Sequence, residues 1–234
     1  MKSLLAILVF TLILSLVPQQ VQASEHVILA GGPALRKWEN LRVESDRHDR
    51  WWANFIHAST MRMDNIRVAY GPDSKIIWLV HRKGYVARAR EDGKPYTSWI
   101  NEQATKRGAK LIWVEGGPSV IRAINSRPDR SITTFDFFGH SNKHCFLLDY
   151  SSEIIGACTA WLHEKDLYKI KASVFSPKAI CKSWGCHSGE SMNAYWRDAI
   201  GREIIGARGK TDYTALSKGK MPSISGRWVL RAPR

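Results

Sequence analysis

Cysteine is scarce in this chain of 234 residues, which contains four and no C-x-x-C pair. A zinc site is therefore not indicated, because Cys181-x4-Cys186-His187 lacks the usual ligand spacing, and we expect neither a metal nor a cofactor. Cys145 and Cys158 flank a predicted hairpin and could pair. Cys181 and Cys186 are too far apart along a strand and turn to bridge without distortion. We expect one disulfide at most, with Cys186 free.

Long apolar runs are also lacking after the first residues. Lys2, the apolar run from Leu4 to Val17 and the small-residue pattern Val21-Gln22-Ala23 are typical of an export signal. We therefore predict a signal peptide over 1–23 and a secreted or periplasmic protein. An uncleaved membrane anchor is the alternative. No later stretch is long and apolar enough to span a membrane, and no Cys follows the cleavage site, so a lipoprotein is not expected.

Acidic residues are few, with 21 Asp and Glu against 35 Lys and Arg, so the net charge is +14. Such a basic chain is expected to associate with an anionic envelope surface. The basic residues are scattered and the tryptophans fall in apolar patterns, so no specific nucleic-acid platform is indicated. A basic protein that binds the envelope or nucleic acid remains an alternative function.

About 210 residues follow the predicted signal, which suits one domain with a sizeable core. Residues 24–64 are predicted to form a mainly helical extension, in which 24–32 is a short lead-in and 33–63 is largely helical. His48-Asp49 within it is interpreted as part of a solvated helix face and not as a metal site. Residues 65–234 are predicted to form an α/β domain.

Strand-like and helix-like segments alternate through that domain. The predicted strands cover 75–81, 110–114, 132–138, 179–184 and 203–207, and the predicted helices cover 96–106, 119–125 and 191–200. Strands separated by helices of this length predict a mainly parallel sheet, whose carboxyl edge carries the site. The segment 143–162 is read as a hairpin, or as a short strand before a helix.

Cys186 and His140 are both predicted to lie at that edge, because each follows an apolar strand. Cys186 should lie at a turn directly before the helix at 191–200, where backbone N–H groups favour a thiolate and can hold an oxyanion. A thiolate beside an imidazole is the arrangement of nucleophilic catalysis. His187 is the rival base, but a neighbour in sequence points in another direction, so His140 is favoured. His144 either orients His140 or covers a loop.

The order of His before Cys, together with Cys186-His187-Ser188-Gly189 after a strand, resembles the caspase-like cysteine peptidases, metacaspases in particular. The resemblance covers residues 66–213. It implies a three-layer fold, Cys186 as nucleophile, His140 as base and an oxyanion hole made of the backbone N–H groups of Ser141 and Cys186. The implied activity is that of an exported cysteine endopeptidase, which hydrolyses a peptide or protein substrate through a thioester acyl-enzyme.

Two positions depart from the metacaspase pattern. Ser141 stands where these enzymes have Gly after the catalytic His. Trp184 stands where they have an Asp that accepts a basic substrate side chain, so a preference for Arg or Lys does not carry over. Asp136 and Asp212 are the candidates for a negative pocket, and the sequence does not choose between them. The departures motivate an alternative, a catalytically inactive relative that binds peptides or proteins in the groove.

Overall fold

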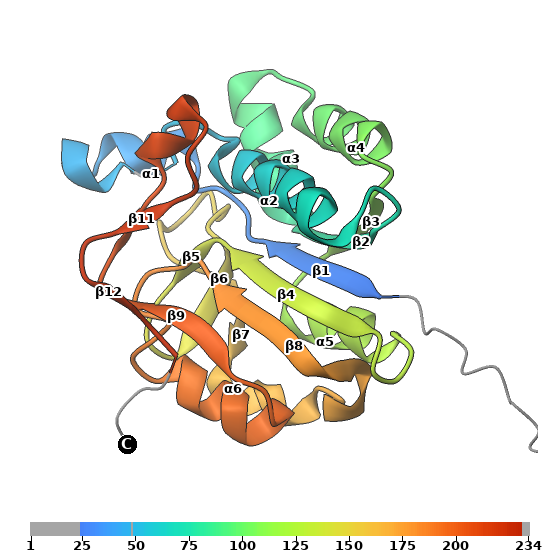
Figure 1. Cartoon of the computed structure of the whole chain (residues 1–234). Coiled ribbons are helices and arrows are strands. Elements are labelled where there is room, and N and C mark those ends of the chain that lie inside the picture. The colour runs from blue at the N-terminus through green and yellow to red at the C-terminus, as the bar shows by residue number, and fades with distance from the viewer. Residues whose placement is uncertain (1–23, 48, 231–234) are drawn as a thin grey trace, which may run out of the picture.

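The computed structural model describes residues 24–47 and 49–230, so the predicted signal peptide lies outside the described residues. Its central sheet has seven strands in the order β12-β9-β8-β4-β1-β2-β3 (Figure 1). These strands are β1 (Glu25–Ala30), β2 (Lys75–His81), β3 (Lys110–Val114), β4 (Ile132–Phe138), β8 (Phe175–Ser183), β9 (Ile204–Arg208) and β12 (Arg227–Val229). Neighbouring strands run parallel, except that β12 is antiparallel to β9.

Two small antiparallel sheets lie beside the main sheet. Their strands are β5 (His140–Ser141), β6 (Cys145–Asp149) and β7 (Ala160–His163) in one, and β10 (Thr211–Asp212) and β11 (Ser223–Ile224) in the other. The α-helices are α1 (Arg36–Asn40), α2 (Asn54–Tyr70), α3 (Arg82–Asp92), α4 (Tyr96–Lys106), α5 (Gly117–Asn125) and α6 (Met192–Ile200). The 3-10 helices are η1 (Glu44–Asp46), η2 (Glu164–Lys169), η3 (Ala172–Val174) and η4 (Thr214–Lys218).

Helices cover both faces of the main sheet (Figure 1). Successive side chains of a strand point to opposite faces, so Val27 and Leu29 of β1 join the core under α5 and α6. Ile28 and Ala30 join the core under α2, α3 and α4. All six residues of β1 are buried, as expected for a parallel strand covered on both faces. The predicted α/β class, with a mainly parallel sheet flanked by helices, is confirmed.

The N-terminal residues differ most from the prediction. The expected lead-in 24–32 contains β1, which pairs with β2 on one side and β4 on the other and so lies inside the sheet. The expected boundary at 64/65 falls within α2. Only α1 and α2 are α-helical in the segment predicted to be largely helical, and residues 49–53 form turns and bends. These residues therefore contribute to the same sheet and cores as the residues after them.

The strand order creates a switch point at the carboxyl edge of the sheet. The chain moves from β1 outward through β2 and β3, and returns to the other side of β1 with β4. In open α/β sheets the crevice at such a point is the usual place for a ligand. Among the described residues, no helix has the length and apolarity needed to cross a bilayer.

Candidate functional site

The strands β4 and β8 bring His140 and Cys186 to the same edge at the same level. The two strands are parallel neighbours, and Phe137 of β4 is in register with Ser183 of β8. His140 and Cys186 each follow their partner of this pair by three positions. The hydroxyl of Ser141 donates a hydrogen bond to the carbonyl oxygen of Cys186 at 2.5 Å, which ties the two strand ends together.

Gly185 is required for this close approach. A Cβ at this position would lie 2.2 Å from the Ser141 hydroxyl oxygen and 3.1 Å from the carbonyl oxygen of Gly139. Real Cβ atoms do not approach other atoms that closely, so any side chain at Gly185 would push the two strand ends apart. The glycine before the cysteine therefore has a packing role that does not depend on any catalytic function.

Cys186 lies in a turn over 185–191 that leads directly into α6, which begins at Met192 and so agrees with the helix predicted over 191–200. The backbone N–H of Thr211 in β10 donates to Cys186 Sγ at 3.2 Å, and the Thr211 hydroxyl lies at the same distance. The backbone donor that contacts the sulfur thus comes from the C-terminal part of the chain.

The turn after Cys186 packs on β9. His187 adopts φ of +58°, a left-handed conformation that is uncommon outside glycine, and its N–H donates to Gly209. Gly189 and Gly206 approach so closely that a Cβ on Gly206 would lie 2.6 Å from the Gly189 nitrogen. The Ser188 hydroxyl donates to the Gly185 carbonyl at 2.9 Å. These contacts fix the direction in which the Cys186 segment leaves β8.

His140 pairs with a carboxylate that comes from a distant part of the chain. His140 Nε2 lies 2.7 Å from Asp49 Oδ2, and the Asp49 side chain is 1 % exposed. Although burial raises the pKa of Asp49, the positive charge and hydrogen bond of His140 bring it below its ordinary value. An ionised carboxylate only accepts hydrogen bonds, so Nε2 of His140 carries a proton and donates it to Asp49.

Asp49 is held by buried hydrogen bonds on both its side chain and its backbone. The N–H of Ala34 donates to Oδ2 at 2.6 Å, and the Asp49 N–H donates to the buried Glu39 carboxylate at 2.8 Å. The guanidinium of Arg88, fully buried in α3, donates to the carbonyl oxygens of Ala34 and Asp49 at 2.8 and 2.9 Å. Asp49, which was read together with His48 as part of a solvated helix face, is thus buried in a turn, and it is a site residue that the sequence analysis missed; His48 lies outside the described residues.

Aromatic edges hold the imidazole of His140. Phe55 of α2 meets it edge-on with ring centroids 5.1 Å apart, and Tyr150 does so at 5.0 Å. Burial raises the pKa of Tyr150 to about 12, so this phenol stays neutral at physiological pH. Such packing restricts the ring, so its orientation does not rest on the Asp49 hydrogen bond alone.

Asp149, the residue before Tyr150, gives a prediction on stability. Its buried carboxylate accepts from Ser151, Thr159 and Lys83, and although burial raises its pKa, these hydrogen bonds lower it to about 2. A carboxyl with a lower pKa in the folded state stabilises the protein above its unfolded pKa of about 4, and this contribution disappears as the pH falls through about 2. Between pH 7 and pH 2, the free energy of unfolding of Asp149→Asn should therefore fall by about 2 kcal/mol less than that of the parent.

Urea unfolding at a series of pH values measures this effect. Asp73→Asn, at an exposed turn, is the matched control and should keep the pH dependence of the parent. If the Asp149 and Asp73 variants show the same dependence as the parent, the hydrogen bonds around Asp149 do not stabilise its ionised form.

The other histidines near the site have their own carboxylate partners. His187 Nδ1 lies 2.6 Å from Glu190 Oε1, and His144 Nδ1 lies 2.9 Å from Glu164 Oε1. His144 therefore pairs with η2, and it is Asp49 that contacts His140. His187 remains a second imidazole with a carboxylate, but its side chain is 39 % exposed, whereas that of His140 is 13 % exposed.

Asp136 and Trp184 lie in the core and do not line an open pocket. Asp136 is 1 % exposed, and its carboxylate accepts from Arg62 Nε at 2.8 Å and from the Trp184 indole N–H at 3.0 Å. The indole of Trp184 stacks on Phe138 and is 8 % exposed. Asp136 is thus a buried ion-pair partner, and the expected negative pocket around it is not present in the described structure.

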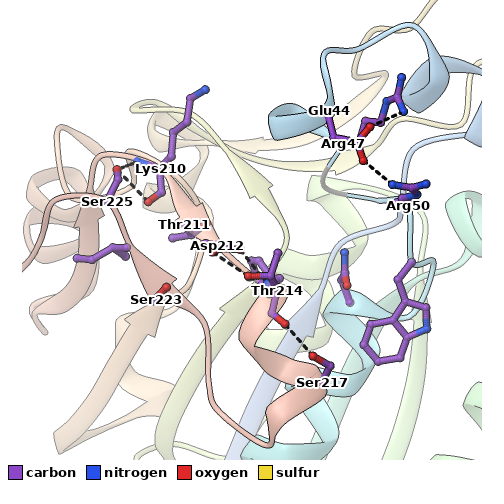
Figure 2. Close-up of a pocket in the computed structure, with 14 residues that line it drawn as sticks. Glu44, Arg47, Arg50, Lys210, Thr211, Asp212, Thr214, Ser217, Ser223 and Ser225 are labelled. Atoms are coloured by element: carbon purple, nitrogen blue, oxygen red, sulfur yellow. Dashed lines mark hydrogen bonds and ion pairs between the residues drawn. The ribbon is translucent and has the colours of Figure 1, made fainter.

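Asp212 does line an open cavity. The cavity has a volume of about 790 Å³ and lies between the loop around η1 and the segment 210–225 (Figure 2). Thr211 and Tyr213 reach it from the Cys186 side: Thr211 contacts the sulfur, and the Tyr213 hydroxyl donates to the Trp184 carbonyl at 2.9 Å. The Asp212 carboxylate accepts from the N–H and hydroxyl of Thr214. The cavity therefore adjoins the Cys186 turn.

Most of the charged side chains that line this cavity are already paired. Arg47 and Arg50 both contact the Glu44 carboxylate, as Figure 2 shows, and Lys210 pairs with Asp46. Hydroxyl groups make up much of the remaining lining, and they belong to Thr211, Thr214, Ser217, Ser223 and Ser225. Such a lining offers hydrogen bonds to a polar ligand without a strong preference for one sign of charge.

The four cysteines are free thiols, so Cys145 and Cys158 do not pair. Burial raises the pKa of Cys145 to about 11 and also raises the pKa values of Cys158 and Cys181. The thiolate is the nucleophilic form of cysteine, so these three side chains are held in the unreactive form. The sulfur of Cys186, by contrast, is half-buried and contacts Thr211, which lines the cavity described above.

Within residues 24–47 and 49–230, no group of three or more His, Cys, Asp and Glu side chains could hold a metal ion. Comparisons of the chain with family models, with curated proteins and with solved structures found no match. The functional argument consequently rests on the residues and their geometry.

Proposed function

We propose that this protein is a cysteine endopeptidase with a caspase-like fold. The observation that supports the proposal is the pairing of β4 with β8, because His140 and Cys186 each follow the last register pair by three positions. Asp49, buried behind His140, adds the third group that a nucleophile–base pair uses for orientation. We interpret the cavity next to Thr211 as the substrate site.

Each residue has a defined role in the proposed reaction. Nδ1 of His140 accepts the proton of the Cys186 thiol, while Asp49 holds Nε2–H and stabilises the imidazolium that forms. The sulfur attacks the carbonyl carbon of the peptide bond. The imidazolium then gives its proton to the leaving amine, and the acyl group remains on sulfur as a thioester. Water, deprotonated by His140, hydrolyses the thioester and restores the thiol.

The backbone N–H of Cys186 is the proposed main donor to the oxyanion. In the described part of the chain this N–H has no hydrogen-bond acceptor, whereas the N–H groups of Trp184, Gly185 and His187 are engaged. The N–H of Ser141 is the second candidate, although Ser141 lies in the ladder between β5 and β6. An oxyanion hole needs donors that are not used in the resting state, and Cys186 meets that condition best.

The test is cleavage of a diverse peptide library by the protein over 24–234 under reducing conditions, with cleavage sites read by mass spectrometry. We expect cleavage at defined sites, and inactivation by a peptidyl chloromethyl ketone that modifies Cys186 and leaves the other three cysteines unmodified. The unfolded protein, treated identically, is the control for general thiol reactivity. Absence of cleavage, together with equal labelling of all exposed thiols, would leave the cavity as a peptide-binding site without catalysis.

A further inference from the structure

A second cavity, which shares Trp51 with the proposed substrate cavity, is lined by tryptophans. It lies between the start of α2 and the middle of α4 and has a volume of about 360 Å³. Its indoles belong to Trp51, Trp52 and Trp99, of which Trp51 is 43 % and Trp99 37 % exposed. Trp52 is fixed in place because it stacks on Tyr96 with ring centroids 3.8 Å apart. Concave sites with aromatic walls and a few polar groups are typical of small-ligand binding.

The polar groups of this cavity are unequally occupied. The Gln103 amide oxygen already accepts from Arg107, and the Thr60 hydroxyl donates to the His57 carbonyl at 2.9 Å. Glu102, by contrast, has no ion-pair partner in residues 24–47 and 49–230, and it is exposed. The Glu102 carboxylate is therefore available to a cation at the rim of the cavity.

The three indoles together with the Glu102 carboxylate favour a cationic ligand over a sugar or an anion. A sugar would need several unengaged hydrogen-bonding groups, and the Gln103 amide oxygen and the Thr60 hydroxyl proton are already used within the protein. The imidazole of His57, which also lines the cavity, lies against Trp51 with ring centroids 5.3 Å apart. Indole faces attract cations more strongly than the other aromatic rings do, and aromatic cages are the common way in which proteins recognise alkylammonium groups. A carboxylate at the rim adds the complementary charge.

We propose that the cavity formed by Trp51, Trp52, Trp99 and Glu102 binds an alkylammonium group. Two sources share this chemistry: a small free ammonium compound and the side chain of a lysine in a peptide. The proposal does not depend on peptidase activity, since none of its arguments uses Cys186, His140 or Asp49, although Trp51 lines both cavities.

Titration calorimetry with the protein over 24–234 tests the proposal. The probes are choline and its neutral analogue 3,3-dimethylbutanol, and Nα-acetyl-lysine amide and its neutral analogue Nα-acetyl-norleucine amide. We expect the charged member of at least one pair to bind at least about ten-fold more tightly than the neutral one. The pair that shows the larger difference identifies the source of the ammonium group.

Substitutions localise the binding. Trp99→Ala should abolish measurable binding and Glu102→Gln should weaken it about three-fold, because an exposed ion pair contributes little free energy. Trp161→Ala, at another exposed indole, is the matched control and should leave binding unchanged. Circular dichroism and thermal unfolding verify that the variants are folded.

Four results would overturn the proposal. They are equal binding of the charged and neutral probes, unchanged binding in the folded Trp99 and Glu102 variants, absence of binding by both ammonium probes, and tighter binding of N-acetylglucosamine in a parallel titration. The last result would identify the cavity as a carbohydrate site.

Discussion

Cys186→Ala is expected to lower the kcat of peptide hydrolysis by roughly 10⁶-fold, because the variant lacks the atom that forms the acyl-enzyme. The fold should be little affected. Cys186 is half-buried, and its sulfur makes hydrogen bonds only with Thr211 among the described residues. The loss should therefore appear in kcat, while thermal unfolding and the binding of an uncleaved peptide stay close to those of the parent.

Cys158→Ala is the matched control for this experiment. Cys158 is also a free, half-buried thiol, and its Sγ–H donates to the Ala160 carbonyl at 3.1 Å, away from the Cys186 turn. This variant should retain full activity. Equal activity of the Cys186 and Cys158 variants would show that the measured hydrolysis does not depend on Cys186. The hydrolysis would then come from another residue or from a contaminating peptidase.

The strands at the carboxyl edge were predictable because of their composition. β2, β4 and β9 are runs of β-branched, aromatic and aliphatic residues bounded by turns, and such runs are typical of buried parallel strands. In β8 a shorter, mostly apolar run over 179–184 predicted a strand directly before the Cys186 turn. Since parallel strands end at one edge, the sequence alone was enough to expect His140 and Cys186 there together.

β1 and the buried loop after it were not predictable in this way. The run Glu25–Ala30 is short, follows the predicted signal peptide and ends in Gly31-Gly32, so nothing local separates a strand from a connecting segment. Its pairing with β2 and β4 depends on residues that are far away in the sequence. α3 was missed because its composition, rich in Arg and Lys, has no clear apolar face.

Asp49 was missed because its partner is distant in the sequence. His140 and Asp49 are 91 positions apart, and the carboxylate is brought to the imidazole by Arg88, which binds the carbonyl oxygens of this loop. A charged residue next to Arg47 and Arg50 looks like part of a solvated surface. The burial of Asp49 follows from tertiary packing, which local sequence patterns do not encode.

Asp49→Asn is expected to lower kcat by about 10³- to 10⁴-fold with little change in KM. Asp49 Oδ2 accepts both the Ala34 N–H and His140 Nε2–H. The amide oxygen of Asn should stay at the position of Oδ2, because the Ala34 N–H needs an acceptor there. The variant then keeps the hydrogen bond to His140 but lacks the negative charge that stabilises the imidazolium formed when His140 takes the proton of Cys186. Since Asp49 does not line the substrate cavity, substrate binding should be preserved.

Glu190→Gln separates this role from the rival in which His187 is the base. Glu190 accepts from His187 at 2.6 Å, so its substitution removes the carboxylate of the second imidazole by the same chemical change. If His140 is the base, Glu190→Gln keeps kcat within a few-fold of the parent while Asp49→Asn loses it. The reverse pattern would assign the base to His187. Asp49 also belongs to the loop that Arg88 binds, so its substitution can affect folding. Thermal unfolding of both variants therefore shows whether a loss of kcat is measured on folded protein. Only folded variants distinguish the two bases.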